Sequence, residues 1–304
     1  MSHIEQTSPE ARVAEVAVHA LGSRLGDVLR VLPLAARHAD DDIEYVHELR
    51  VASRRAVATM GIFAELLPKR RARRMTKVLE EIRRAAGTAR DIDVLMARWR
   101  SDAGAISSLQ RHIERRRRRA QEPLVAIDER LSRTGRLARK ISKLLATAAS
   151  KMSRDDDDDS PRFGVWSRHA LAARIDAFFV GAGTSSQDQA ALHRFRISGK
   201  DLRYAMEVLA GAFPAELSND LYPVVELLQG KTGKITDHAD ACRRLEKRLA
   251  KHRSRREAGA AAHMLEAERA RLNEATQAFH DWWSPERSGE LQRRLLSLSA
   301  LTPA

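Results

Sequence analysis

The nine residues VHELRVASR at positions 46–54 return as LHRFRISGK at positions 192–200, an offset of 146 positions from His47 to His193. A histidine, an arginine and a third cation therefore recur at the same spacing in both halves of the chain. The same offset carries Gly87 onto Gly233 and Asp91 onto Asp237 without a gap. A repeat of this length indicates one architectural unit that is used twice.

Helical spacing divides each copy into a cationic and an apolar face. In the first copy the cationic stripe holds His47, Arg50 and Arg54, and in the second it holds His193, Arg196, Lys200 and Arg203. A basic stripe beside a core face is usually solvated surface, and a single histidine on a helix is usually structural. Ionisable residues duplicated at the same helical phase favour a shared ligand instead, because a solvated face tolerates any polar residue.

The chain is predicted to be all-α, since glycine and proline are few and apolar residues recur at helical spacing almost everywhere. Pro123 should kink or divide the fourth helix, and Pro68 and Pro214 should end the two histidine-bearing helices. A short last helix should follow Ser284-Pro285. The other helices are expected at 10–37, 42–67, 69–101, 104–131 and 135–149, and then at 164–181, 187–212, 216–249 and 255–283.

Residues 151–162 separate the halves and contain five consecutive aspartates, Asp155 to Asp159. Like charges repel and the segment has no apolar period, so we expect a solvated acidic linker. The alternative is that the aspartates occupy the basic face when no polyanion is present, or form a weak cation site. The expected domains are a first helical-bundle half at 1–150 and a second at 163–304.

The overall charge points to an anionic partner. Lys and Arg number 54 against 41 Asp and Glu, which gives a formal net charge of +13 and a sequence pI of about 10.5. Composition alone does not choose among nucleic acid, a membrane surface and polyphosphate. The single cysteine, Cys242, excludes an intramolecular disulfide and a Cys-x-x-Cys metal site. With no signal peptide and no apolar run long enough for a membrane span, we expect a cytoplasmic protein without a membrane partner.

Three motifs resemble the CHAD family, the conserved-histidine α-helical domains: His47-x-x-Arg50-x-x-x-Arg54-Arg55, RDIDV at 90–94 and LHRFRISGKDLRY at 192–204. The resemblance covers roughly residues 12–300. It implies two four-helix bundles in tandem, with pseudo-twofold symmetry around a basic central pore or groove, and binding of inorganic polyphosphate, in some members on polyphosphate granules. Other members are fused to a triphosphate-hydrolase module. No alternating Glu-x-Glu-x-Lys strand precedes the helices here, so a stand-alone member is expected.

The resemblance also implies which residues face the ligand. Asp201 stands at the position equivalent to Arg55, and Arg55 lies off the main stripe, so Arg55 ranks lower. Arg90 and Asp91 could instead form an internal ion pair, and the charges near the ends of the following helices could be plain surface. A phosphate chain needs converging Arg and Lys donors. The polyphosphate-binding candidates are His47, Arg50, Arg54, Arg55, Arg83, Arg84, Arg90, His193, Arg196, Lys200, Arg203, Lys231 and Lys234.

Other chemistries have less support. The string GKTGK at 230–234 imitates the end of a phosphate-binding loop, but Val225 occupies the upstream glycine position and the preceding segment reads as helix. Neither histidine has a His or carboxylate at i+4, so no metal site is expected. The stripes lack a nucleophile and an acid pair, so we expect a binding protein without a cofactor, with a phosphate-processing enzyme as a less favoured alternative.

Nucleic acid is the stronger rival partner. The run RRRRR at 115–119 and the cluster of Arg136, Arg139, Lys140 and Lys143 would also hold a phosphate backbone. Aromatic residues make up only 5% of the chain, and none alternates with these clusters to stack on bases. Any nucleic-acid binding should therefore be weak and non-specific.

Overall fold

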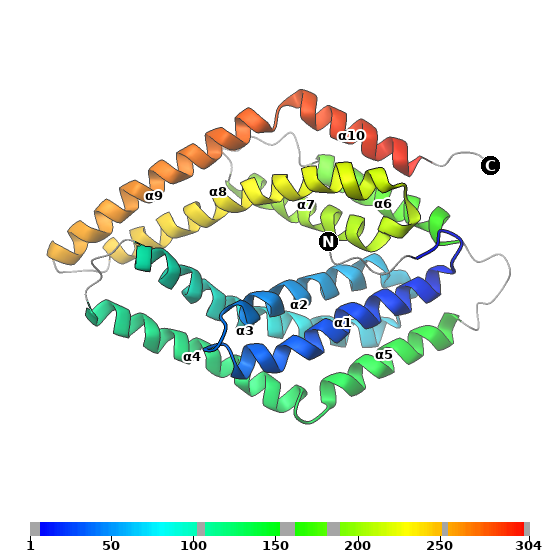
Figure 1. The fold of residues 1–304 in the computed structure, drawn as a ribbon, viewed down its shortest axis with the longest axis horizontal. Helices are drawn as coiled ribbons and strands as arrows, with labels where there is room; N and C mark the ends of the chain where they lie inside the picture. The colour runs from blue at the N-terminus through cyan, green and yellow to red at the C-terminus, as the bar shows by residue number, and fades with distance from the viewer. Residues whose placement is uncertain (1–6, 102–106, 153–161, 181–188, 251–254, 301–304) are drawn as a thin grey trace. The chain divides into compact units, whose positions relative to one another are not determined.

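The computed structural model describes residues 7–101, 107–152, 162–180, 189–250 and 255–300 (Figure 1). Over these residues the chain forms ten α-helices and no named strand. The all-α prediction is confirmed for this part of the chain. The chain folds as two compact units, one of residues Glu10–Phe163 and one of Gly164–Ala304 together with Met1–Pro9.

The first unit, Glu10–Phe163, contains five helices around one hydrophobic core. Helix α1 packs against α2, α4 and α5, and α3 packs against α2 and α4 (Figure 1). Leu25, Leu49, Leu79 and Leu124 bring four of these helices into the core and are fully buried. The helices are α1 (Val13–Arg37), α2 (Glu44–Ile62), α3 (Lys69–Ser101), α4 (Ser107–Leu131) and α5 (Arg136–Met152).

The second unit repeats this order of helices. Phe178 of α6 stacks on Phe195 of α7 with ring centroids 5.0 Å apart, and Trp283, just after α9, completes the aromatic contact. A π-helical segment, Leu217–Leu221, leads into α8. The helices are α6 (Phe163–Val180), α7 (Gln189–Leu209), α8 (Tyr222–Leu249), α9 (Arg255–Trp282) and α10 (Pro285–Ser299). At the offset of 146, α6 to α10 correspond in order to α1 to α5.

The helix boundaries differ from the expected ones at the prolines. The two histidine-bearing helices end before Pro68 and Pro214, and a 3-10 turn follows each of them. The residue before each proline is extended, because the proline ring disfavours the α conformation there. Of the two outcomes predicted at Pro123, a kink or a division of the fourth helix, the division does not occur: α4 runs through Pro123. The carbonyl that loses its helical partner belongs to Arg119, an exposed residue.

Both ends of the predicted linker belong to regular structure. Helix α5 continues to Met152, and Arg162 forms an isolated antiparallel bridge with Arg12. Phe163 then donates its backbone N–H to the carbonyl of Ala11. The aspartate run itself lies outside the described residues.

A buried polar network ties α4 to its neighbours in the first unit. Arg117 pairs with Asp93 of α3, and both side chains are almost completely buried. Arg117 also donates to Gln121 over 2.7 Å, and Gln121 donates to the carbonyls of Ala35 and Ala36 near the end of α1. One arginine of the 115–119 run is therefore an internal structural group.

We predict that Arg117→Ala will lower the free energy of unfolding by about 3–5 kcal/mol, because it leaves the Asp93 carboxylate buried without its partner. Arg116→Ala and Arg118→Ala, at exposed positions on the same helix, should each change it by less than about 0.5 kcal/mol. Urea denaturation of the three variants measures the difference. Equal effects at all three positions would show that the Arg117–Asp93 pair does not stabilise the unit.

Candidate functional site

The first unit gathers predicted ligand residues from two helices into one group, the His47 cluster, made of His47, Arg50, Arg54 and Arg90. Helix α2 carries the first three on one face, and Arg90 comes from α3. Arg90 donates to Glu44 at the start of α2 over 3.1 Å, and Arg50 lies 3.6 Å from Asp91. An ion pair between Arg90 and Asp91 was the alternative considered for these residues; instead, each of them pairs with a residue of α2.

The His47 cluster has an excess of positive charge. Burial lowers the pKa of His47 below its ordinary value of 6.5, and the guanidinium groups of Arg90, Arg54 and Arg50 lower it further, while Glu44 opposes them. The half-buried Arg54 has a buried Nε that makes no hydrogen bond within the described part of the chain. Three guanidinium groups therefore converge near one imidazole in a place that suits an anion.

The second unit carries an equivalent group, the α7 cluster, made of His193, Arg196 and Lys200. His193 is exposed, whereas Arg196 and Lys200 are half-buried. Helix α7 is held on α8 by a hydrogen bond from the Gln229 amide to the carbonyl of Gly199. A Cβ added to Gly199 would lie 3.4 Å from the Phe178 ring, an ordinary van der Waals contact, so this glycine faces α6.

In each unit, the arginine of the repeated motif lies over a glycine of the following helix. A Cβ built on Gly87 of α3 would lie 3.2 Å from Nη1 of Arg50, and a Cβ on Gly233 of α8 would lie 4.0 Å from Nη2 of Arg196. These are equivalent positions at the offset of 146. The arginine of each repeated motif thus lies over the same place on the following helix, in agreement with the shared helical phase found in the sequence.

Two predicted ligand residues have internal partners instead. Arg203 donates to the Tyr222 hydroxyl over 2.9 Å and pairs with Glu226 and Glu207. Lys231 donates to the carbonyl of Ala278 and lies over the Trp282 ring. Arg203 is already paired with two carboxylates, and Lys231 is stacked on an aromatic ring. Both therefore contribute less to binding an anion than the clusters do.

The remaining predicted residues lie on α2, α3 and α8, outside the two clusters as defined. Arg83, Arg84 and Lys234 are exposed, and Arg84 donates to the carbonyl of Glu80 in its own helix. Arg55 is half-buried on α2, away from the stripe. The string at 230–234 lies inside α8 and forms no loop.

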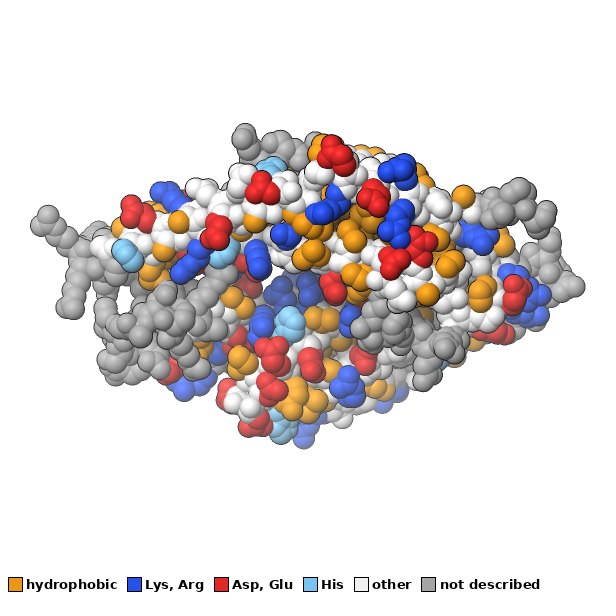
Figure 2. All heavy atoms as spheres, turned by 45° about the horizontal axis from the view of Figure 1, so that its top comes forward, with side chains coloured by type: hydrophobic (Ala, Val, Ile, Leu, Met, Phe, Trp, Pro, Cys, Tyr) orange, Lys and Arg blue, Asp and Glu red, His pale blue; other side chains and the backbone are white. Residues whose placement is uncertain are grey.

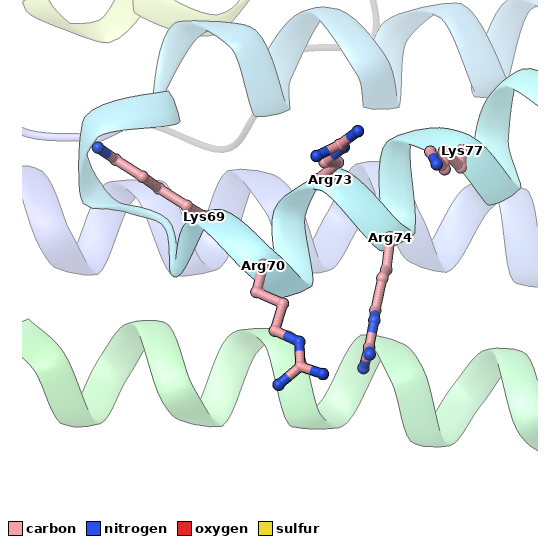
Figure 3. Close-up of a pocket in the computed structure, with 5 residues that line it drawn as sticks. All are labelled: Lys69, Arg70, Arg73, Arg74 and Lys77. Atoms are coloured by element: carbon pink, nitrogen blue, oxygen red, sulfur yellow. The ribbon is translucent and has the colours of Figure 1, made fainter.

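A further cationic group lies on α3, and none of its residues is among those predicted to bind the ligand. Five side chains at the start of this helix line a hollow of about 400 Å³ (Figure 3). The signal in the sequence is a stretch of nine residues, 69–77, that holds six cations and no acid. The lining residues are Lys69, Arg70, Arg73, Arg74 and Lys77.

Elsewhere the surface charges are mixed. On the face shown in Figure 2, cationic and acidic side chains are interspersed, and Arg269 of α9 and Arg294 of α10 pair with carboxylates of their own unit. Within the described ranges, no group of three or more His, Cys, Asp or Glu side chains could hold a metal ion. No helix that the structure describes is long and apolar enough to cross a membrane.

Comparison with known proteins identifies the family. The model of the CHAD domain family matches residues 19–246, which is most of the chain, so the chain belongs to the CHAD family. This family is associated with polyphosphate-related proteins. No curated protein matches the chain.

Two solved structures have a similar fold. The crystal structure of the CHAD domain from the plant Ricinus communis matches with a TM-score of 0.68 and 21% identity, over 97% of this chain and 96% of that one. PptA from Streptomyces chartreusis matches with a TM-score of 0.62 and 17% identity, over 92% of this chain and 100% of that one. At these identities the likeness shows the fold alone.

The charges around His47 predict two opposite shifts of its pKa. Arg90→Gln should raise the pKa of His47, because it removes a nearby positive charge and releases Glu44, and Glu44→Gln should lower it further. Titration of the histidine ring protons by NMR measures both shifts. If the two variants move the pKa in the same direction, the imidazole does not sense these charges.

The lowered pKa also affects stability. Between pH 6.5 and the lowered pKa the unfolded chain binds more protons than the folded one, so the His47 contribution to the free energy of unfolding falls as the pH decreases through this window.

Proposed function

We propose that this member of the CHAD family binds inorganic polyphosphate through the His47 cluster and the α7 cluster. The proposed role is binding rather than catalysis, with association with polyphosphate granules as one consequence. The observation that carries the proposal is the convergence of Arg50, Arg54 and Arg90 on His47, with Arg196 at the equivalent place in the second unit.

The chemistry of the clusters supports a phosphate ligand. Guanidinium groups bind two phosphate oxygens at once and keep their charge at any physiological pH. The nearby carboxylates Glu44 and Asp91 have about half of their side-chain surface exposed. Their ion pairs with Arg90 and Arg50 are therefore weak, of the order of 1 kcal/mol or less. A polyanion can displace such contacts at small cost, and the carboxylates hold the arginines in position until it does.

The two histidines have different parts in the proposal. His47 is half-buried among arginines and is disfavoured as an imidazolium in the free protein. A bound polyanion would favour the charged form, so binding would be accompanied by proton uptake at His47. His193 is exposed, and its ring can donate to phosphate from the surface of α7.

The finer architecture predicted from the sequence is part of this proposal: two pseudo-symmetric bundles around a basic groove, with one polyphosphate chain contacting both basic helices. The matching positions of Arg50 over Gly87 and of Arg196 over Gly233 support this architecture, because equivalent cations in the two units are suited to a ligand made of identical phosphate groups.

Non-specific binding of nucleic acid is the alternative function. Burial of Arg117 weakens it, because the 115–119 run loses one of its cations to the core.

The first test of the proposal removes the cations of both clusters. A variant with Arg50, Arg54, Arg196 and Lys200 replaced by Ala should lose most of its affinity for long polyphosphate and keep its helix content and cooperative melting, because none of the four lies among the core side chains. Calorimetric titration in about 150 mM salt, where weak surface contacts are screened, measures binding. DNA at matched phosphate concentration is the competitor. Unchanged affinity of the variant for long polyphosphate would refute the assignment of the clusters.

The second test uses ligand length. If one chain contacts both clusters, the second contact becomes intramolecular, and the affinity per phosphate should rise steeply with chain length. Orthophosphate and triphosphate should then compete poorly at equal total phosphate. An Arg196→Ala, Lys200→Ala variant should lose most of the length dependence while keeping the affinity for short chains. An affinity per phosphate that is independent of length in the parent protein would favour diffuse attraction.

A further inference from the structure

The cationic hollow on α3 shares no residue with the two proposed clusters. We name it the outer face: Lys69, Arg70, Arg73, Arg74 and Lys77, all exposed and all within the first turns of α3. They lie within nine consecutive residues, and the first and last are about 12 Å apart along the helix axis. Figure 3 shows Arg70 and Arg74 extending from α3 toward α5, the green helix below it. Arg90 of the His47 cluster lies 13 residues beyond Lys77, or about 20 Å further along the same helix.

The outer face carries charge that the described parts of the protein do not balance. None of its five cations makes a hydrogen bond or an ion pair with another described residue. The first carboxylates further along α3 are Glu80 and Glu81, and Glu81 is paired with Arg130 of α4. Cations at a helix N-terminus also oppose the helix dipole, and the first turn of α3 holds no acid. These charges repel one another and the helix dipole adds to the repulsion, so a bound anion would relieve it.

The second unit has the opposite charge at the equivalent positions. At the offset of 146, Arg70 and Arg74 correspond to Glu216 and Asp220. Those acids accept hydrogen bonds from Arg294 of α10, over 2.7 Å to Glu216 and 3.2 Å to Asp220. On α5 the offset of 146 leads to the buried Ala148, and the neighbouring Thr147 matches Arg294 in being half-buried; neither residue is charged. An internal ion-pair network in one unit is thus replaced by an unbalanced cationic hollow in the other.

We propose that the outer face is a second binding site for a linear phosphate polyanion, specific to the first unit. The inference extends the proposed function to a new surface and rests on it for the class of ligand. Arg and Lys donors repeated along one helix suit a chain of phosphates, which carries charge at short, regular intervals. A free polyanion is favoured over a membrane, because the apolar neighbours Met75 and Val78 are buried and offer nothing to insert into lipid. The stretch 69–77 also lacks an aromatic residue on which bases could stack.

The test compares two full-length variants that lose the same charge. The outer-face variant combines Arg70→Gln, Arg73→Gln, Arg74→Gln and Lys77→Gln, because glutamine is a good helix former and these positions are exposed. The control variant combines Arg243→Gln, Lys247→Gln, Arg269→Gln and Arg293→Gln, at exposed positions of the second unit. Both should keep the circular dichroism and melting behaviour of the parent.

Binding of long-chain inorganic polyphosphate is measured by calorimetry over a series of salt concentrations. The outer-face variant should bind at least about tenfold more weakly than the control at low salt, and its plot of log K against log salt should be shallower by about one for each phosphate group that it no longer binds. A further variant with Arg70, Arg73 and Arg74 replaced by Lys should keep most of the binding. Equal affinities and salt slopes for the outer-face and control variants would overturn the inference.

Two more probes distinguish the source of the phosphate. DNA and vesicles of phosphatidylcholine with phosphatidylserine are titrated against the same variants. A loss specific to DNA or to vesicles, with polyphosphate binding unchanged, would overturn the proposal in favour of that partner. The proposed function fails separately, if the Arg50, Arg54, Arg196 and Lys200 variant still binds polyphosphate like the parent. Because different variants test the two proposals, either can fail alone.

Discussion

The arginine that lies over a glycine of the next helix is the interaction on which the site depends. Arg50 can lie against α3 because Gly87 has no side chain, and an alanine there would place a Cβ 3.2 Å from the guanidinium, so that the arginine would have to shift by a few tenths of an ångström. At Gly233 the equivalent separation is 4.0 Å, an ordinary van der Waals distance. The first unit is therefore the more constrained of the two. Its arginine is the one that also lies near Asp91 and lowers the pKa of a neighbouring histidine.

The motif RDIDV at 90–94 builds this site by pairing with other helices. Arg90 reaches Glu44 and Asp91 reaches Arg50, both on α2, whereas Asp93 pairs with Arg117 of α4. The first two pairs are half-exposed and add little stability, so their main effect is to orient the cations. The third is buried, where loss of one partner is costly. This short segment thus joins α3 to α4 through a buried ion pair and to α2 through two partly exposed ones.

Helical spacing and the internal repeat made most of the fold and part of the site predictable. Helix positions follow from apolar periodicity, and the cationic stripes follow from the i, i+3, i+7 spacing of His47, Arg50 and Arg54. The roles of Arg203 and Lys231 were not predictable in this way, because they depend on Tyr222, Glu226 and Trp282, which tertiary packing brings near. That α4 continues through Pro123 was not predictable for a related reason: the cost of a proline inside a helix depends on its surroundings in the fold.

The two copies of the repeat keep the same charge at some surface positions and reverse it at others. A position that binds the same kind of ligand in both copies has to keep its charge, as Arg50 and Arg196 do. A position that carries Arg74 in one copy and Asp220 in the other cannot bind phosphate in both. In the second copy the acid has an internal use, because it accepts a hydrogen bond from Arg294. In the first copy the uncharged Thr147 and Ala148 stand at this place on α5, so the positive charge at Arg74 has no corresponding structural use and is available for a ligand. The charge reversal between the copies is therefore better explained by a binding surface of the first unit alone than by drift of a solvated face, which would not give five cations on one side of a helix.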